Sequence, residues 1–143
     1  MRVIIGSDHA GFQAKQQLTQ HLQDQGHEVE DLGTHTEESC DYPLIAKAVA
    51  QKAVAEHAFG ILICGTGIGM CMAANKVTGA RAALPYSTET ATLAREHNNA
   101  TILCLGARTM TDKQREQYTD FFLRTPFSGD ERHAKRVAQV DAI

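Results

Sequence analysis

Apolar residues along the chain recur in short runs that are separated by longer amphipathic segments. These runs, which predict strands, lie at residues 3–5, 27–32, 60–64, 80–84 and 101–106. Between them, the composition favours helices at residues 12–25, 44–58, 69–77, 87–97 and 111–124, with a last helix from about residue 130. Because strands alternate with helices, the pattern predicts right-handed crossovers and a parallel sheet that is covered on both faces.

Start and stop signals for helices support these boundaries. Pro43 suits the first turn of a helix and Gly26 suits a helix end. Thr111 and Ser128 each stand three residues before a Gln or Glu, which is the spacing of a capping box. The last helix is short and basic at its start, so it would hardly pack alone, and we expect it to dock on a neighbouring subunit.

The size and charge of the chain limit what it can be. With 143 residues and 43% hydrophobic content, we expect one domain, at 1–143. The net charge of -3 comes from interspersed acidic and basic residues. There is no run of basic residues of the kind that binds nucleic acid or anionic lipid. No stretch reaches membrane-spanning length and no apolar signal core precedes the first polar turn, so we expect a cytoplasmic protein.

The four cysteines are expected to be reduced thiols. They are Cys40, Cys64, Cys71 and Cys104. Without a secretory signal, their even number gives no reason to pair them. Their spacing does not resemble a zinc site, so we expect no metal.

Three polar segments are candidates for a ligand site. In an open parallel sheet, ligands bind beyond the carboxyl ends of the strands, where the strand order reverses. "GSDHAG" follows the first predicted strand and "CGTGIG" follows the third, while the helix after the fourth strand ends in "REHNN". We expect all three to converge on one edge of the sheet.

The glycine loop contains Gly65, Gly67 and Gly69 and matches neither the dinucleotide fingerprint nor the Walker A motif. Glycines let backbone N–H groups face a ligand, and the helix that follows favours negative charge at its N-terminus. Cys64 precedes this loop, where a thiol can have its pKa lowered from about 8.5 and act as nucleophile or base. On position alone, however, a cysteine that ends a buried strand is more often a small hydrophobic residue.

Other polar residues allow two interpretations each. His97 stands where a helix should end, a position that favours a cationic imidazole, but it could equally be a surface cap. Asp8 and His9 offer a carboxylate and an imidazole side by side, although Asp commonly stabilises turns.

Arginines near the end of the chain could bind a phosphate. Arg132 and Arg136 are four residues apart and share one helix face, with His133 adjacent, and Arg108 follows the fifth strand. A solvated basic face is the commoner outcome for such a pattern.

Taken together, the motifs resemble the type B ribose-5-phosphate isomerase family, which shares its fold with the subunits of galactose-6-phosphate isomerase. The resemblance runs over essentially the whole chain, in order. It is carried by "GSDHAGF" at 6–12, "DYP" at 41–43, "ICGTGIGMCMAANK" at 63–76, "REHNNA" at 95–100, "LGAR" at 105–108 and "RHAKRV" at 132–137.

The resemblance implies a fold and an assembly. The fold is a Rossmann-like three-layer αβα sandwich around a five-stranded parallel sheet. The assembly is a homodimer or a dimer of dimers with active sites shared between subunits. The reaction interconverts aldose and ketose phosphates, typically D-ribose 5-phosphate and D-ribulose 5-phosphate, in the pentose phosphate pathway and without metal or cofactor.

The resemblance also implies residue roles, and it reverses the preference for Cys64 as a core residue. His97 opens the sugar ring, assisted by Asp8 and Thr66, and Cys64 is the base that moves the proton between C2 and C1 through an enediolate. Amides of the glycine loop, from Gly65 through Gly67 to Gly69, stabilise the enediolate. The phosphate and sugar ligands are His9, Tyr42, Asn98, Arg108, Arg132, His133 and Arg136.

Two departures from the family pattern matter. Some relatives have a glutamate at the position of Met70 and lack the cysteine, so here the base should be the thiolate. Many relatives have a glycine pair where this chain has Asp130 and Glu131, beside the predicted phosphate clamp. Two other functions stay open: an isomerase of a six-carbon sugar phosphate such as allose or galactose 6-phosphate, and a non-catalytic module that binds a sugar phosphate or a nucleotide.

Overall fold

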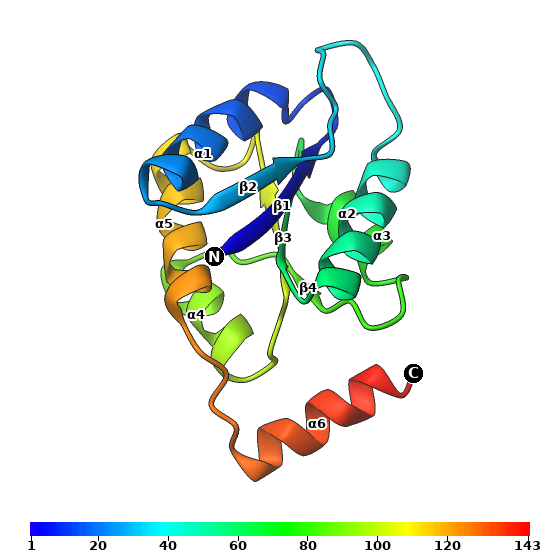
Figure 1. The fold of residues 1–143 in the computed structure, drawn as a ribbon, viewed down its shortest axis with the longest axis vertical. Coiled ribbons are helices and arrows are strands. Elements are labelled where there is room, and N and C mark those ends of the chain that lie inside the picture. Colours follow the sequence, from blue (N-terminus) through cyan, green and yellow to red (C-terminus); the bar gives the residue numbers. More distant parts are fainter.

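The chain folds around one parallel sheet of five strands. A computed structural model describes residues 1–143. The sheet has the order β2-β1-β3-β5-β4, and every pair of neighbouring strands is parallel (Figure 1). Its strands are β1 (Arg2–Ser7), β2 (Glu28–Asp31), β3 (Phe59–Cys64), β4 (Ala82–Ala83) and β5 (Ile102–Gly106).

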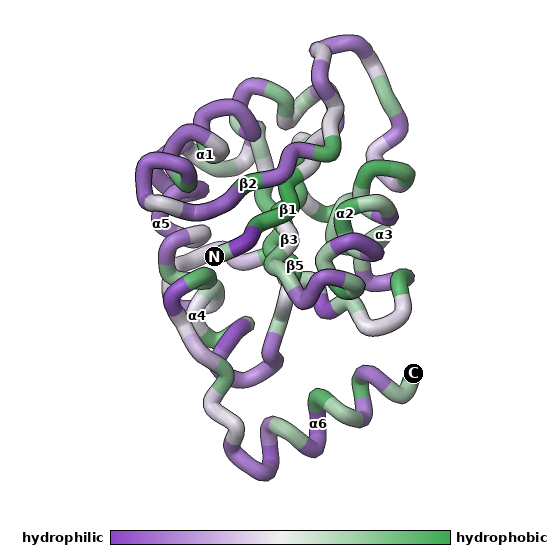
Figure 2. The backbone as a smooth tube through the Cα atoms, viewed as in Figure 1, coloured by the Kyte–Doolittle hydropathy of each residue, from purple (hydrophilic) through white to green (hydrophobic).

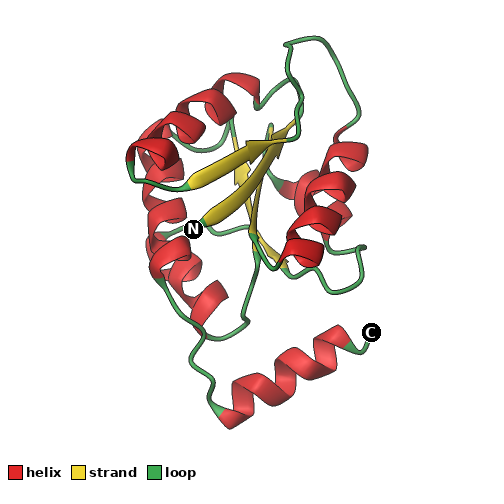
Figure 3. Cartoon of the chain, in the orientation of Figure 1, coloured by secondary structure: helices red, strands yellow, loops and turns green.

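Helices cover both faces of the sheet and make it a three-layer sandwich (Figure 3). One face carries α1 (Phe12–Asp24), α4 (Thr88–Glu96) and α5 (Asp112–Arg124). The other face carries α2 (Tyr42–Glu56) and α3 (Ile68–Ala74). The last helix, α6 (Glu131–Asp141), stands apart from the sandwich near one end of the molecule (Figure 1).

The central strand β3 shows why the sheet must be covered twice. Side chains alternate across a strand, so Ile61 and Ile63 enter the core beneath α1, α4 and α5, while Leu62 and Cys64 enter the core beneath α2 and α3. Figure 2 shows this distribution, with hydrophobic colour on the central strands and hydrophilic colour on the outer turns of α1.

The predicted element boundaries agree with the structure to within three residues, and most of the predicted helix signals are present. Pro43 lies in the first turn of α2, Gly26 follows the end of α1 with φ 86°, and Thr111 caps α5 in a capping box. The capping box predicted at Ser128 is wrong. Asp130 is the N-cap of α6, and Ser128 Oγ instead accepts a hydrogen bond from the Asp130 amide at 3.2 Å.

The strand order reverses between β1 and β3, since the chain moves from β1 outward to β2 and then returns to the other side for β3. This reversal is the point at which open parallel sheets bind ligands, beyond the carboxyl ends of the strands. The loops that follow β1 and β3 are therefore the first place to look for a site.

Candidate active site

Asp8 and Cys64 lie next to each other at the carboxyl edge of the sheet. Ser7 of β1 pairs with Ile63 of β3, and the Asp8 amide donates to the Ile63 carbonyl at 3.1 Å. The Asp8 side chain is buried, and its Oδ1 accepts a hydrogen bond from the Gly11 amide at 3.1 Å. Asp8 thus does stabilise a turn, and the same turn fixes its carboxylate beside the end of β3.

The Cys64 sulfur is held by the glycine loop. Cys64 is 5% exposed, and the Gly67 amide donates to its Sγ at 3.2 Å. Gly67 is the N-cap of α3 and has φ 81°, a left-handed conformation that glycine adopts without cost. A backbone donor that faces sulfur stabilises negative charge on it, so this contact suits a thiolate.

Three amides of the same loop have no hydrogen-bond partner within the chain. They belong to Gly65, Thr66 and Gly69. The Ile68 amide, in contrast, donates to Thr66 Oγ1 at 3.3 Å, and the Gly67 amide is used by Cys64. The loop therefore offers free N–H donors on both sides of the Cys64 contact.

Two further predicted residues cover this loop. An added Cβ at Gly65 would lie 3.1 Å from Arg108 Nη1, so the Arg108 guanidinium lies over the residue that follows Cys64. An added Cβ at Gly69 would lie 2.6 Å from Tyr42 Cζ, so the Tyr42 ring packs against the first turn of α3. His9 lies in the loop after β1, and its Nδ1 accepts a hydrogen bond from the Cys40 amide at 3.3 Å.

His97 and Asn98 do not join this group, and the prediction that all three segments converge on one edge is wrong. His97 caps the C-terminus of α4, and the segment after it returns to the start of β5. There the Thr101 carbonyl accepts a hydrogen bond from the amide of Gly60, near the beginning of β3. A crossover helix runs antiparallel to its strands, so its C-terminus lies at their amino ends, and β3 separates His97 from Cys64 by roughly 17 Å or more.

A second group of predicted residues surrounds His97. The rings of His97 and His133 have centroids 4.2 Å apart with planes tilted by 33°. His133 is the only buried residue of α6, at 6% exposure, and Ser128 Oγ lies 2.9 Å from its Nδ1. Burial lowers the pKa of His133, as do the neighbouring His97 and Arg132. The His133 ring is therefore favoured in the neutral form, in which a histidine can both accept and donate a proton.

The three arginines predicted to bind phosphate are available for a ligand. Arg108, Arg132 and Arg136 are exposed, and none of them forms an ion pair within the chain. Arg108 lies at the carboxyl edge with Cys64, whereas Arg132 and Arg136 lie on α6 near His97. The predicted site residues thus form two groups at opposite edges of the sheet, which we call the thiol half-site (Asp8, His9, Tyr42, Cys64–Gly69, Arg108) and the histidine half-site (His97, Asn98, Arg132, His133, Arg136).

Sequence reasoning missed a residue that supports the thiol half-site. Lys15 of α1 is fully buried, and its Nζ donates to Asp31 Oδ1, Asp31 Oδ2 and the Thr34 carbonyl, each at 2.6 Å. This network ties the loop after β2 to α1 beside the end of β1. A signal was present, because Lys15 is a charged residue three and seven positions before Leu18 and Leu22 on the apolar face of a helix.

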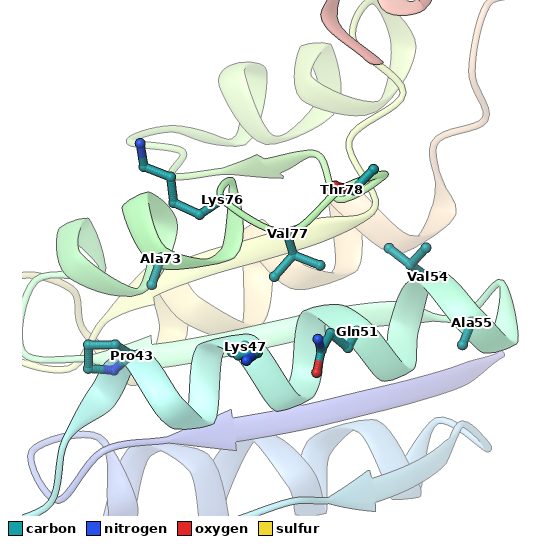
Figure 4. Close-up of a pocket in the computed structure, with 9 residues that line it drawn as sticks. All are labelled: Pro43, Lys47, Gln51, Val54, Ala55, Ala73, Lys76, Val77 and Thr78. Carbon is teal, nitrogen blue, oxygen red and sulfur yellow. The ribbon is translucent and has the colours of Figure 1, made fainter. Parts of the chain in front are cut away.

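The larger cavities of the chain overlap the two half-sites only in part, and a cavity of about 350 Å³ is lined by Thr66 and Ile68 of the thiol half-site. The largest, of about 810 Å³, lies between α2 and α3, with apolar walls and with Lys47 and Lys76 among its lining residues (Figure 4). A cavity of about 250 Å³ beneath α6 is lined by Asn98 and Arg136 but not by His97. None of the five principal cavities is lined by Cys64 or His97.

The remaining predictions about sites concern metals, thiols and membranes. All four cysteines are free, as expected. No group of three or more His, Cys, Asp or Glu side chains is placed to hold a metal ion. No helix combines the length and the apolar character that crossing a bilayer needs.

Comparison with known proteins assigns the chain to a family. The family model described as Ribose/Galactose Isomerase matches residues 3–140. The chain belongs to this family. It is 46% identical over 139 residues to the ribose-5-phosphate isomerase B of Mycolicibacterium paratuberculosis, which covers 96% of this chain and 87% of the relative.

Solved structures of this family agree closely with the fold. A ribose 5-phosphate isomerase from Thermotoga maritima superposes with a TM-score of 0.95 at 47% identity, over 99% of this chain and 98% of that one. The ribose-5-phosphate isomerase B of Mycoplasma genitalium, solved with bound ribulose-5-phosphate, has a TM-score of 0.93 at 43% identity, over 99% of this chain and 94% of that one. The predicted Rossmann-like sandwich is therefore confirmed.

Proposed function

We propose that the chain interconverts D-ribose 5-phosphate and D-ribulose 5-phosphate, with Cys64 as the base that moves the proton between C2 and C1. The observation that carries this proposal is the Cys64 thiol at the switch point of the sheet, 3.2 Å from a backbone donor and beside three free amides. The names of relatives that share over 40% of the sequence support the choice of substrate.

The proposed reaction begins with ring opening. A proton leaves the anomeric hydroxyl and a proton reaches the ring oxygen, while the bond between the anomeric carbon and the ring oxygen breaks. His97 is suited to this transfer, because a neutral imidazole accepts a proton at one nitrogen and donates from the other. The His97 ring is stacked on that of His133, which lies 4.2 Å away between centroids and can take part in the proton transfer.

Isomerisation then requires a base and a stabilised oxyanion. The Cys64 thiolate takes the proton from C2, the electron pair forms the C1–C2 double bond of the enediolate, and the thiol returns the proton to C1 as the proton on O2 passes to O1. Such a positioned base contributes about 10²- to 10⁴-fold to the rate. The free amides of Gly65, Thr66 and Gly69 are the proposed donors to the enediolate oxygens. Met70 is fully buried and cannot replace the base.

The division into two half-sites supports a homodimer or a dimer of dimers with shared sites. Each proton transfer needs the catalytic atom within about 3 Å of the substrate atom, so Cys64 and His97 must both lie beside the same sugar. One chain holds these two residues at opposite edges of its sheet. A second copy can bring its histidine half-site to the thiol half-site of the first. Large apolar side chains on α2, α3 and the loop after β4 are exposed and available for such an interface, namely Leu44, Ile68, Met72 and Tyr86.

Exchange of the substrate C2 hydrogen with solvent tests the proposed base. In deuterated water, the wild-type protein should introduce deuterium at C2 of ribose 5-phosphate, and Cys64→Ser should lose this exchange by about 10²- to 10⁴-fold while still binding the sugar phosphate. A Cys104→Ser variant, which changes a buried thiol of the same core, is the matched control for damage to the fold.

Two outcomes contradict the proposal. Undiminished exchange in Cys64→Ser would move the base to another residue, and binding without any exchange in the wild type would leave a non-catalytic module. Running the same assay over pentose and hexose phosphates shows which sugar is preferred, because one extra carbon changes the depth of the pocket and leaves the motifs unchanged.

A further inference from the structure

A cationic pocket lies at the amino edge of the sheet, where α2 and α4 end and β3 and β5 begin. It has a volume of about 430 Å³, and no acidic residue lines it. Neither Cys64 nor His97 lines it. Its polar lining residues are His57, Arg81, Arg95, Asn99 and Thr101.

Arg95 is a buried cation without a carboxylate partner. It is 8% exposed, its guanidinium carbon lies 5.0 Å from the centroid of the Phe59 ring, and no carboxylate comes within 4.0 Å of it. Burial lowers the pKa of Arg95, and the positive charge of Arg81 lowers it further. Because an unpaired buried charge is costly, this position favours the arrival of an anion.

Unused hydrogen-bonding groups accompany this charge. Arg95 Nη1 donates to Asn99 Oδ1 at 2.9 Å and to the Ala100 carbonyl at 2.6 Å, and Nε donates to the Thr125 carbonyl at 3.3 Å. These bonds satisfy the end of α4, but Nη2 has no partner in the chain. The hydroxyl of Thr101 is also buried without a partner, and such groups are rare in folded proteins.

Arg81 brings a second guanidinium to the same place. Its Nε donates to the Asn99 carbonyl at 2.9 Å, so Arg81 and Arg95 both bind the one residue Asn99. Arg81 Nη1 contacts both oxygens of Asp141, at 2.8 and 2.9 Å. Asp141 comes from the last turn of α6 and is partly exposed, so an incoming anion can replace it.

The charge balance of the pocket explains why an incoming anion must replace Asp141 at Arg81. The C-terminal ends of α2 and α4 face this region, and each contributes roughly half a negative elementary charge. Together they offset about one of the two guanidinium charges, and Asp141 offsets the other. The site therefore accommodates one anionic group at a time beside Arg81.

We infer that this pocket binds a phosphate group between Arg95 and Arg81, in exchange for Asp141. A tetrahedral phosphate accepts hydrogen bonds in several directions, which matches two guanidinium groups and the Thr101 hydroxyl better than a planar carboxylate does. Binding would release the last turn of α6, the helix that carries Arg132 and Arg136. The inference does not depend on the proposed isomerase activity.

Backbone amide chemical shifts during a titration with inorganic phosphate test this site. Arg108→Ala serves as the background, because it removes a guanidinium from the thiol half-site and leaves the amino edge intact. We expect shifts that saturate at Gly79, Asn99 and Thr101. Repeating the titration with glycerol phosphate distinguishes free phosphate from a phosphate monoester as the preferred form.

Substitutions at the pocket should change its affinity for phosphate in opposite directions. Arg81→Gln should weaken phosphate binding about tenfold or more, as loss of a charge-assisted hydrogen bond does. Thr101→Val should weaken it less, and Asp141→Asn should tighten it, because the competing carboxylate is gone. Arg124→Gln, an exposed arginine stacked on Phe121, is the control and should change nothing.

Three results would overturn the inference. Shifts confined to residues 65–69 would place all phosphate binding at the thiol half-site. Unchanged affinity in Asp141→Asn would refute the exchange. An equal loss of phosphate affinity in Arg81→Gln and Arg124→Gln would mean that phosphate responds only to the general positive charge of the surface. Arg95 is left unchanged throughout, since it anchors the end of α4 and its loss could unfold the chain.

Discussion

At the scale of single residues, the thiol half-site depends on close backbone approaches that only glycine permits. Gly67 brings its amide to Cys64 Sγ, and a Cβ there would lie 2.7 Å from Leu84 Cδ1 and 2.9 Å from the Leu105 carbonyl carbon. Gly69 instead makes room for a side chain, the ring of Tyr42. The two glycines thus serve different purposes within one turn.

Gly69→Ala should separate substrate binding from stability. Gly69 lies inside α3, where alanine is favoured over glycine by about 1 kcal/mol, so the helix itself should not be weakened. The new Cβ would lie 2.6 Å from Tyr42 Cζ and must displace the ring. We expect a higher KM for the sugar phosphate with an unchanged or higher Tm, measured by steady-state kinetics and thermal unfolding.

A double mutant isolates the cause of this effect. If Gly69→Ala acts only through Tyr42, adding it to Tyr42→Ala should raise KM no further, because the ring it displaces is already gone. Additive losses in the double mutant would instead mean that Gly69 contacts the substrate through its own backbone.

Sequence reasoning located the thiol half-site because its residues directly follow strands. Asp8 comes after β1, Cys64 ends β3 and Arg108 comes after β5, and the carboxyl ends of parallel strands meet at one edge. The spacing of Lys15 on the apolar face of α1 indicated its burial, but not its partners, because Asp31 and Thr34 lie on a different part of the chain and no local spacing relates them to Lys15.

At the scale of elements, the sequence predicted every helix and strand but misplaced the end of α4. Motif order along the chain says nothing about which edge a residue occupies, and His97 belongs to the opposite edge because α4 runs back against the strands. The last helix was also underdetermined. Its basic face could be identified from spacing, whereas its contacts through His133 and Asp141 depend on loops that only the fold brings near.

The attachment of α6 should weaken in mild acid. The pKa of His133 is lowered from its ordinary value of 6.5, mainly by burial, then by His97 and Arg132, while Asp130 acts in the opposite direction and Arg136 adds to the lowering. A lowered pKa in the docked state means that the docked state retains its full stability above about pH 6.5. That stability is lost as the pH falls through the lowered pKa.

Amide hydrogen exchange along α6 measures this release. Protection at Ala134 and Val137 should fall from neutral to mildly acidic pH in the wild type. In His133→Phe, a neutral aromatic ring can still stack on His97, so protection should depend much less on pH. A parallel loss of protection in both proteins would assign the pH dependence to other groups.

At the scale of the whole molecule, one chain does not bring the proposed base, Cys64, and the proposed ring-opening residue, His97, to the same edge of the sheet. One copy presents Cys64, three free amides and Arg108 at the carboxyl edge, and His97, Arg132 and Arg136 at the amino edge. Closed two-fold symmetry, the commonest arrangement of homodimers, would bring each edge of one copy to the opposite edge of the other and create two equivalent sites.

Mixing two inactive variants tests this arrangement. Cys64→Ser lacks the base and keeps the histidine half-site, and His97→Ala has the reverse defect. After unfolding and refolding together, a mixed dimer contains one site with both wild-type residues and one site with neither. Random assembly makes half of the dimers mixed, so about a quarter of the wild-type activity should return.

The control mixes two variants of the same half-site. Cys64→Ser and Asp8→Asn both damage the thiol half-site, so every site in their mixed dimer carries one defect and activity should stay at the level of the parents. Recovery in this control would mean that Cys64 and Asp8 serve one site from different chains. No recovery in the Cys64 and His97 mixture would mean that each chain completes its own site. That result would require a rearrangement that carries His97 across the length of β3, because the fold holds the two residues at opposite ends of the same sheet.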